Sequence, residues 1–418
     1  MRGGQAKFST SDIYCCDSEN PKPLYSPPLL ILEASNFSKR SLTPSCYADD
    51  LPCYFVSKSI SSSWLHFALD YVRFGMVCRP WRRVVVENGY SSPSFLPWLM
   101  LSQKINSELR GVCYPYKHRS FYLYLPELNN KRCWGSPFGW VVTLDSDFQL
   151  GLLNPLSRAQ LMLPPLRKCP NLKNMDCGAK RFRNSFVYKA ALSSSPLCLD
   201  FVVLAIYSDN EKMAILKGGS HTWTPLECCP GYVDDAICFR GIVYIVSSLG
   251  EIVICDCQGS VLQNIILTPL VDEVAKTNFI SAYLVELDGQ IYVLCRFMSD
   301  TRNTAGTPFR PYMRTRRFDV YKLDLGNGKW YEVVESLGNW SIFVGTNYSF
   351  SICTNEHPEC ESNCIYFTDD YSGVSHNTPT GYDMGVYNLE TQKIQWLAQD
   401  DLSVFSFSVP VWFKPSLP

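Results

Sequence analysis

From about residue 110 to the C-terminus, apolar and polar positions alternate with a period of two and are interrupted by short polar turns. This alternation is typical of β-strands that bury one face. The strands recur in a fixed order: an apolar strand, a tight turn, a second strand and, after a further turn, a strand that often carries Trp. The first example runs through residues 139–144, turns at 145–147, continues through 148–153 and ends at 161–163.

The same order recurs four more times. The recurrences begin at residues 201, 241, 289 and 364 and reach Trp223, Ile265, Trp330 and Trp396. A spacing of roughly 40 to 65 residues is that of a four-stranded propeller blade with loop insertions. Further strands are expected in residues 112–128 and 403–413. The pattern predicts a mostly β fold, a six-bladed β-propeller whose two ends share the closing blade, because an open ring would expose two strand edges. A seven-bladed propeller and a pair of β-sandwiches are the alternatives.

Residues 69–85 show a helical period instead. Leu65, Leu69, Val72 and Met76 form one apolar stripe at helical spacing, and Phe74, Val77, Cys78 and Trp81 form a second. Two stripes favour a helix that packs on its own module with one face and on a partner with the other. The alternative is a helix buried within a helical subdomain. Arg73, Arg79, Arg82 and Arg83 surround the stripes, which favours an acidic partner.

Composition divides the chain into four parts. Residues 1–45 are rich in Ser, Pro, Asn and Cys and show no lasting period, which predicts a poorly ordered N-terminal tail. Residues 46–90 hold the small α-helical module. Residues 91–109 form a linker that starts with turn-forming Gly, Ser and Pro, and residues 110–418 form the propeller. The apolar segment 96–101 within the linker is expected to pack one module against the other.

Composition and charge exclude several classes of protein. The chain has 418 residues, 46% of them hydrophobic, which is enough for two or more domains with a packed core. It carries 38 basic and 39 acidic residues, and this balance argues against a nucleic-acid-binding protein. No run is long and apolar enough to span a membrane, and the N-terminus lacks the apolar core of a signal peptide. We expect an intracellular protein, in the nucleus or cytoplasm, that is not secreted and not bound to a membrane.

The sequence contains no catalytic constellation. The motifs G-x-S-x-G, H-E-x-x-H, G-x-G-x-x-G and G-x-x-x-x-G-K-[ST] are missing, and none of the 5 histidines is placed to pair with a nucleophile. Asp369 and Asp370 could serve a propeller glycosidase, but they follow an expected strand, and we expect them to cap or turn a loop. We predict no catalytic residue and no cofactor.

One group of cysteine and histidine residues lies close enough together in the sequence to suggest a metal site. Cys353, His357, Cys360 and Cys364 could hold a tetrahedral zinc ion. Their spacing departs from the usual C-x2-C knuckle and Cys364 begins a strand, so we favour a long solvent-exposed loop without metal. The 19 cysteines are scattered and lie mostly in apolar runs, which indicates small buried hydrophobes rather than a disulfide scaffold.

Two basic stretches, residues 167–183 and 302–317, fall between expected strands. We expect both to be loops on a blade rim. The second ends in Arg314, Arg316 and Arg317, which are the candidate residues for binding an acidic protein target. A solvated loop and a nuclear import signal are the alternatives.

Two sets of residues resemble those of a known family. Leu51-Pro52 falls where an F-box opens, and the further matching positions are Ile60, Leu69, Val72, Phe74, Val77, Cys78, Trp81 and Arg82. In the second set, Cys133-Trp134-Gly135-Ser136, Gly139-Trp140, residues 152–157 and residues 364–370 resemble the signatures of plant F-box proteins that carry a KIB-type, kelch-like β-propeller.

This resemblance implies a function. An F-box docks on the Skp-type adaptor of a cullin ubiquitin ligase, so the ten F-box positions above are the expected adaptor-binding residues. The propeller is expected to bind an unknown protein target for ubiquitination and proteasomal degradation, and the chain is then a substrate receptor and not an enzyme. The Ser-rich run 57–63 weakens the helix expected after Leu51-Pro52. It motivates the alternative of a propeller interaction scaffold whose F-box does not function.

Overall fold

A computed structural model of the protein describes residues 13–15, 22–23, 96–102, 108–114, 119–145, 147–170, 186–208, 211–267, 280–300, 313–324, 331–370, 383–397 and 409–416. The chain divides into two compact units, residues 1–95 and residues 96–416. Within the first unit, β1 (Ile13–Cys15) and β2 (Lys22–Pro23) pair antiparallel. Apart from these two strands, the tail expected in residues 1–45 and the module expected in residues 46–90 lie outside the described residues.

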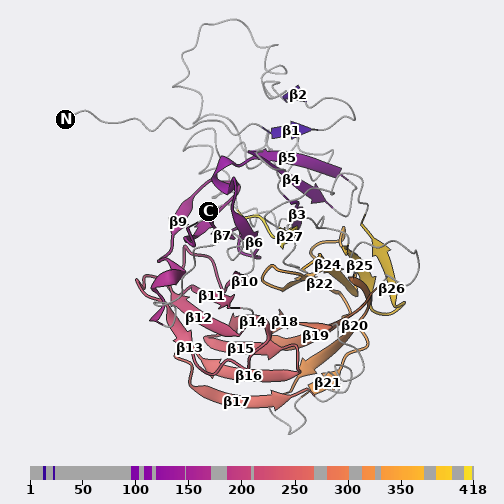
Figure 1. Ribbon diagram of the computed structural model, residues 1–418. Helices are drawn as coiled ribbons and strands as arrows, with labels where there is room; N and C mark the ends of the chain where they lie inside the picture. The colour runs from indigo at the N-terminus through magenta and orange to yellow at the C-terminus, as the bar shows by residue number, and fades with distance from the viewer. Residues whose placement is uncertain are drawn as a thin grey trace, which may run out of the picture. The chain divides into compact units, whose positions relative to one another are not determined.

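The second unit consists of six β-sheets arranged around a common centre, which makes it a six-bladed β-propeller (Figure 1). Blade 1 contains β3 (Trp98–Met100), β4 (Leu109–Tyr114), β5 (Arg119–Tyr124) and β27 (Val411–Phe413). Blade 2 contains β6 (Arg132–Trp134), β7 (Val141–Leu144), β8 (Leu150–Leu153) and β9 (Gln160–Met162). Blade 3 contains β10 (Val187–Leu192), β11 (Val202–Tyr207), β12 (Lys212–Lys217) and β13 (Thr224–Leu226). Blade 4 contains β14 (Val233–Phe239), β15 (Ile242–Ser247), β16 (Glu251–Asp256) and β17 (Val261–Ile266). Blade 5 contains β18 (Ile280–Leu287), β19 (Gln290–Asp300), β20 (Met313–Leu323) and β21 (Tyr331–Val333). Blade 6 contains β22 (Trp340–Val344), β23 (Phe350–Cys353), β24 (Cys364–Phe367), β25 (Gly385–Asn388) and β26 (Lys393–Trp396). The predicted fold and number of blades are confirmed.

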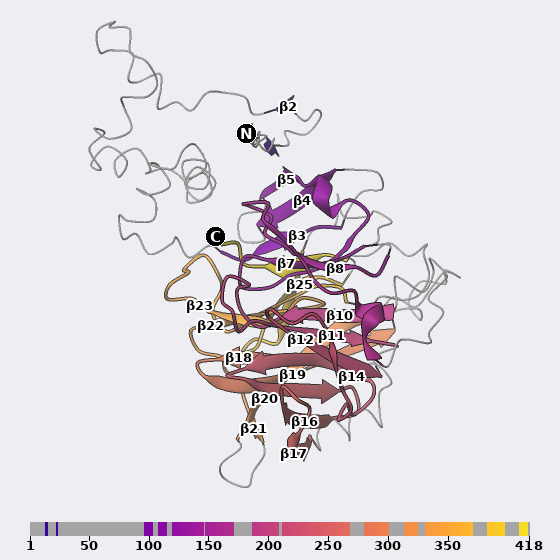
Figure 2. The same ribbon diagram turned by 90° about the vertical axis from the view of Figure 1, so that its left-hand side faces the viewer.

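In blades 2 to 5 the strands follow one another from the centre outward in chain order, as Figures 1 and 2 show for blades 4 and 5. Two-residue turns join several of them. Arg240-Gly241 joins β14 to β15 with φ of 51° and 77°, and Asp288-Gly289 joins β18 to β19 with φ of 50° and 76°. Positive φ at both positions defines the type I′ turn, which follows the twist of the strands and favours glycine at its second position. The turn type explains why Gly241 and Gly289 stand directly before β15 and β19.

Apolar side chains fill the space between neighbouring blades. Ile245 of blade 4 and Leu284 and Val293 of blade 5 are completely buried in one such layer. A second layer joins blades 2 and 3 around Trp134 and Trp223. Burial of one large apolar side chain contributes about 1.5–3 kcal/mol, so these layers are the main source of the propeller's stability.

Strands from both ends of this unit close the ring. β27 pairs antiparallel with β3, and Trp412 lies opposite Leu99. The prediction that the two ends share the closing blade is confirmed. The blade begins earlier than residue 110, however, because β3 lies within the segment 91–109 that the sequence pattern assigns to a linker. A strand of only 3 residues is too short to show an alternating pattern.

Aromatic side chains pack where the ring closes. Trp412 meets Phe343 edge to face with ring centres 5.3 Å apart, and Phe343 stacks on Tyr366 at 4.7 Å. Both arrangements are favourable for aromatic pairs. The closing strand of blade 1 is thereby joined to the inner strands of blade 6.

Blade 6 has a fifth strand because β23 is added at its inner edge. β22 pairs antiparallel with β23 and parallel with β24, so residues 354–363 carry the chain across the blade. In that segment His357 and Cys360 are buried, whereas Asn355 and Glu356 are exposed. The long solvent-exposed loop expected here is therefore a half-buried crossover, because it has to pack against the strands that it connects.

In the described part of the propeller 13 cysteines are free thiols, and 7 of these are buried. Six of the buried cysteines pack as small apolar side chains in the hydrophobic clusters, as expected: Cys169, Cys238, Cys255, Cys295, Cys360 and Cys364. In the described ranges no helix has the length and apolarity needed to cross a membrane.

Candidate functional site

The predicted adaptor-binding residues lie outside the described residues. They are Leu51, Pro52, Ile60, Leu69, Val72, Phe74, Val77, Cys78, Trp81 and Arg82. The candidate site is therefore built from the propeller, which offers a buried polar network at its centre and a group of arginines at its surface.

The arginines predicted for target binding lie on a strand and not in a loop. Arg314, Arg316 and Arg317 belong to β20, where Arg314 pairs with Ser299 and Arg317 pairs with Phe297 of β19. The prediction of a rim loop is wrong for these residues because consecutive arginines hide the alternation of the strand. Most of the remainder of both basic stretches lies outside the described residues.

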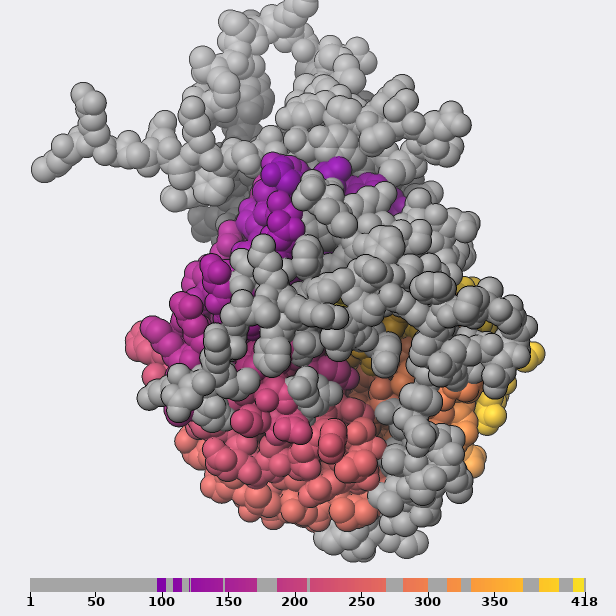
Figure 3. Space-filling model, in the orientation of Figure 1, coloured from indigo at the N-terminus to yellow at the C-terminus, as the bar shows by residue number. Residues whose placement is uncertain are grey.

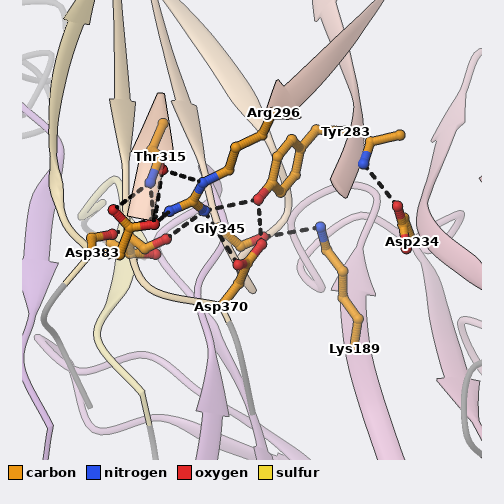
Figure 4. Close-up of polar contacts among 10 residues, drawn as sticks. Lys189, Asp234, Tyr283, Arg296, Thr315, Gly345, Asp370 and Asp383 are labelled. Atoms are coloured by element: carbon orange, nitrogen blue, oxygen red, sulfur yellow. Dashed lines mark hydrogen bonds and ion pairs between the residues drawn. The ribbon is translucent and has the colours of Figure 1, made fainter. Parts of the chain in front are cut away.

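Arg296 on β19 is the centre of the buried network (Figure 4). Its side chain is 0% exposed. Nη1 donates to Asp370 Oδ1 at 3.2 Å and to the Tyr283 hydroxyl at 3.0 Å. Nη2 donates to Asp383 Oδ2 at 2.9 Å, and Nε donates to the Thr315 hydroxyl at 2.8 Å. Every nitrogen of the guanidinium therefore has a partner, which is the condition under which a charge is tolerated in a protein interior.

The two carboxylates come from the ends of one connection. Asp370 follows β24 and Asp383 precedes β25, so Arg296 ties both ends of this blade 6 connection to blade 5. Asp383 also accepts hydrogen bonds from the backbone N–H of Thr315 at 3.0 Å and from its hydroxyl at 2.8 Å. Tyr283 donates its hydroxyl to Asp370. The result is a continuous polar contact between the two blades.

A second branch connects blades 3, 4 and 6. Lys189 on β10 forms an ion pair with Asp235 on β14 at 2.7 Å and donates to the backbone oxygen of Gly345 at 3.3 Å. Asp235 also accepts a hydrogen bond from the Ser349 hydroxyl at 3.0 Å. Lys189 Nζ lies 5.8 Å from the ring centre of Tyr283, where the two branches meet (Figure 4). Four of the six blades thus contribute to one network.

Burial raises the pKa of the acids on β14. It raises the pKa of Asp234 well above its usual range, although the Ala282 N–H donates to its Oδ2 at 2.8 Å and favours the ionised form. Burial also raises the pKa of Asp235, while the charge and hydrogen bond of Lys189 act in the opposite direction. The network therefore depends on the pairing of its charges rather than on contact with solvent.

The charge of Arg296 is paired with carboxylates inside the protein. Burial alone would lower the pKa of Arg296, but Tyr283, Asp370 and Asp383 outweigh burial and raise it well above its usual value. Asp370 does more than cap or turn the loop after β24, because its side chain is 6% exposed and is paired with Arg296.

No group of three or more His, Cys, Asp and Glu side chains within the described ranges is placed to hold a metal ion. Cys364, which belongs to the zinc-like pattern, has Asn388 and Glu361 as polar neighbours at 3.6 and 3.9 Å. Its thiol lies on β24 and is buried, and burial raises its pKa to about 11.

The motifs that resemble the plant family lie where the ring closes. A Cβ atom at Gly135 would stand 1.8 Å from the backbone oxygen of Trp412, so only glycine allows this close approach. The backbone oxygen of Ser136 accepts from the Lys414 N–H at 3.0 Å, and the Asn154 side chain donates to the backbone oxygen of Ser416 at 3.1 Å. These motif residues hold the C-terminal segment against blade 2.

Comparisons with known proteins agree with this architecture. A putative F-box protein of Arabidopsis thaliana is 24% identical over 369 residues, which cover 81% of this chain and 94% of that protein. The F-box protein SKIP23 of Arabidopsis thaliana is 22% identical over 377 residues, covering 81% of this chain and 88% of that protein. Among solved structures, a nidogen–laminin complex aligns with 77% of this chain at 11% identity and a TM-score of 0.38, which is too low to support a functional comparison.

The family comparison covers most of the propeller. Residues 113–388 match the KIB1-4 beta-propeller family, and this range includes the Arg296 network and the motifs around Gly135. The resemblance to plant F-box proteins with a KIB-type propeller is confirmed by this match and by the names of the relatives. With more than half of its length matched and with six blades closed by its own terminal strands, the chain belongs to the KIB1-4 beta-propeller family.

Proposed function

We propose that the protein is the substrate-recognition subunit of a Skp–cullin–F-box ubiquitin ligase. The observation that carries the proposal is the combination of an F-box-like string in residues 51–82 with a propeller of the KIB1-4 family. Relatives that align with most of the chain are named F-box proteins. A cullin complex of this kind works inside the cell, in the nucleus or cytoplasm.

The proposed mechanism is proximity. The module in residues 46–90 binds the Skp-type adaptor and through it a cullin, while the propeller holds a protein target near the ubiquitin-loaded enzyme of the complex. The chain itself makes and breaks no bond. The buried network and the closed ring suit this role because a rigid surface loses little entropy when it binds a target.

Adaptor binding tests the proposal directly. Phe74, Val77 and Trp81 are the expected apolar anchors, because buried aromatic and aliphatic side chains dominate such interfaces. Trp81→Glu or Val77→Glu should abolish co-purification of the full chain with a purified Skp-type adaptor. Trp396→Glu is the matched control: it makes the same change at a Trp of the propeller that is 41% exposed, and it should leave adaptor binding intact. A folded Trp81→Glu protein that still binds the adaptor would refute the assignment.

The Ser-rich run 57–63 favours a second candidate, a propeller interaction scaffold whose F-box does not function. A binary binding assay separates the two functions. If the unmodified full chain, with its propeller folded, fails to bind any Skp-type adaptor, the scaffold replaces the ligase subunit.

A further inference from the structure

One surface of the propeller combines arginine with exposed tryptophan. Arg314, Arg316 and Arg317 occupy the start of β20 in blade 5, and Trp396 ends β26 at the outer edge of blade 6. We call these four residues the Arg–Trp patch. The Arg314 guanidinium lies 4.7 Å from the ring centre of Trp396, so the patch bridges the two blades. Figure 3 shows β26, in yellow, at the surface of the molecule.

A β-bulge turns Arg316 outward. β19 and β20 pair regularly as far as Phe297 and Arg317, and the next pair is Met298 with Thr315, so Arg316 is the extra residue. Bulges re-aim side chains and are common next to functional sites. Arg316 is exposed, and its Nε donates to the Ser299 hydroxyl at 2.5 Å. Arg316 and Arg317 are therefore both exposed although they are neighbours on one strand.

A series of contacts between arginines and aromatic rings connects the patch to the buried network. The Arg296 guanidinium lies 4.9 Å from the ring centre of Phe367, and Phe367 meets Trp396 edge to face at 6.0 Å. Trp396 in turn lies under Arg314. An arginine held over a ring keeps its conformation, so less entropy is lost when it binds a ligand. Arg314 and Trp396 are thus held in place by ring contacts that continue to the buried network.

The charge of the patch is only partly neutralised. Arg317 pairs with Asp319 at 3.1 Å. Arg314 and Arg316 form no ion pair with any carboxylate in the described part of the chain. The patch therefore presents two positive charges beside the partly exposed ring of Trp396.

We propose that the Arg–Trp patch binds an acidic peptide segment of a protein partner. Guanidinium groups bind carboxylates through two parallel hydrogen bonds, and the Trp396 ring offers an apolar surface for the residue next to the acid. Nucleic acid is the less suitable ligand, because the chain has a formal net charge of −1 and the patch contains one exposed ring where strand binding uses several. This inference rests on the proposed function, for which the partner is the ligase target.

Peptide selection tests the inference with the full chain. A random-peptide phage library is selected on the immobilised protein, and the most enriched peptide is synthesised with a fluorescein label and titrated by fluorescence anisotropy. We expect the enriched peptides to be rich in Asp and Glu and their affinity to fall with added NaCl. The double variant Arg314→Glu/Arg316→Glu should weaken binding by at least about tenfold, since each lost charge-assisted hydrogen bond has that effect or more.

Arg240→Glu is the matched control. Arg240 is also exposed and lies over an aromatic ring, with its guanidinium 4.8 Å from the ring centre of Phe239 in blade 4. This variant should bind the peptide as the unmodified chain does. The neutral double variant Arg314→Gln/Arg316→Gln, checked for an unchanged melting temperature, should also lose affinity, and it replaces the charge-reversed protein if that protein does not fold.

Several outcomes overturn the inference. They are enriched peptides without acidic residues, equal affinity in the folded double variant, an equal loss in Arg240→Glu, and tighter patch-dependent binding of poly(U) RNA than of any peptide. Trp81→Glu should leave peptide binding unchanged. Loss of peptide binding can therefore be distinguished from loss of adaptor binding. Either hypothesis can be refuted while the other stands.

Discussion

Arg296 carries its charge in the middle of the propeller, where an unpaired ion would be very costly. Its side chain is 0% exposed, and Asp370 and Asp383 hold it from two sides at 3.2 and 2.9 Å. A buried ion pair adds little net stability, because desolvation offsets the attraction. Removing one member is different, since it leaves the other charges buried without a partner.

Arg296→Met should accordingly destabilise the propeller by about 3–5 kcal/mol, the usual effect of breaking a buried ion pair. Arg317→Met is the control, because Arg317 pairs with Asp319 at a side chain that is 45% exposed. An exposed pair contributes about 0–1 kcal/mol. Urea denaturation followed by tryptophan fluorescence measures both. Equal losses of unfolding free energy in the two variants would show that the buried ion pairs of Arg296 contribute no more than an exposed pair. The triple variant Arg296→Met/Asp370→Asn/Asp383→Asn should recover part of the unfolding free energy that Arg296→Met loses.

Single residues of the network were the hardest part to predict from sequence. Asp370 stands after an apolar strand, where an acid usually turns a loop, and nothing in its neighbourhood reveals Arg296 on another blade. Asp235 and Lys189 are 46 positions apart by number yet form an ion pair of 2.7 Å. Buried charges of this kind are specified by tertiary pairing, which a local pattern does not contain. The F-box-like residues remain predictions, because they lie outside the described residues.

At the scale of the element, the strands of blades 2 to 5 that the sequence pattern does not predict are the innermost ones. The second, third and fourth strands of blades 2 to 5 correspond to the recurring apolar units, whereas β6, β10, β14 and β18 do not appear in them. β14 carries Asp234 and Asp235 at buried positions, and β10 carries Lys189. Polar residues at core positions break the alternation that marks a strand. The buried polar residues that build the network therefore make β10 and β14 hard to recognise from the sequence pattern.

The contact between β6 and β27 gives a prediction at this scale. Gly135 follows β6, and a Cβ atom there would lie 1.8 Å from the Trp412 oxygen and 2.7 Å from its carbonyl carbon. Because both are backbone atoms, Gly135→Ala forces the closing strand to move, at a cost of about 1–3 kcal/mol or more. Gly151→Ala on β8 is the control, since its nearest atom, the Thr143 hydroxyl oxygen at 3.3 Å, belongs to a side chain.

Thermal unfolding and hydrogen exchange measure the effect. We expect a lower melting temperature for Gly135→Ala and faster exchange of the β3 and β27 amides, with little change in blade 4. If Gly151→Ala lowers the melting temperature as much as Gly135→Ala, the close approach does not limit ring closure.

At the scale of the whole molecule, ring closure was predictable because it follows from a general constraint. An open propeller leaves two strand edges unpaired, so strands from both ends were expected in one blade. The pairing of β27 with β3 is the observed solution. Its consequence is that one short strand at the C-terminus stabilises sheets that lie far from it in sequence.

Deletion of residues 409–418 should therefore open the ring. Val411, Trp412 and Phe413 are each no more than 1% exposed, and their burial contributes on the order of 5–9 kcal/mol at about 1.5–3 kcal/mol per side chain. That is comparable with the whole stability of a typical domain, about 5–15 kcal/mol. The shortened chain should melt at a much lower temperature in calorimetry and elute as aggregates in size-exclusion chromatography, because the edge of β3 is then free to pair with other chains.

A further sample separates ring closure from general damage. A synthetic peptide of residues 409–418, added to the shortened chain, should raise its melting temperature in a concentration-dependent way, because a ligand that binds only the folded state stabilises it by mass action. If the shortened chain melts like the complete one, β27 is dispensable and the blades are held together by the inter-blade layers and the Arg296 network alone.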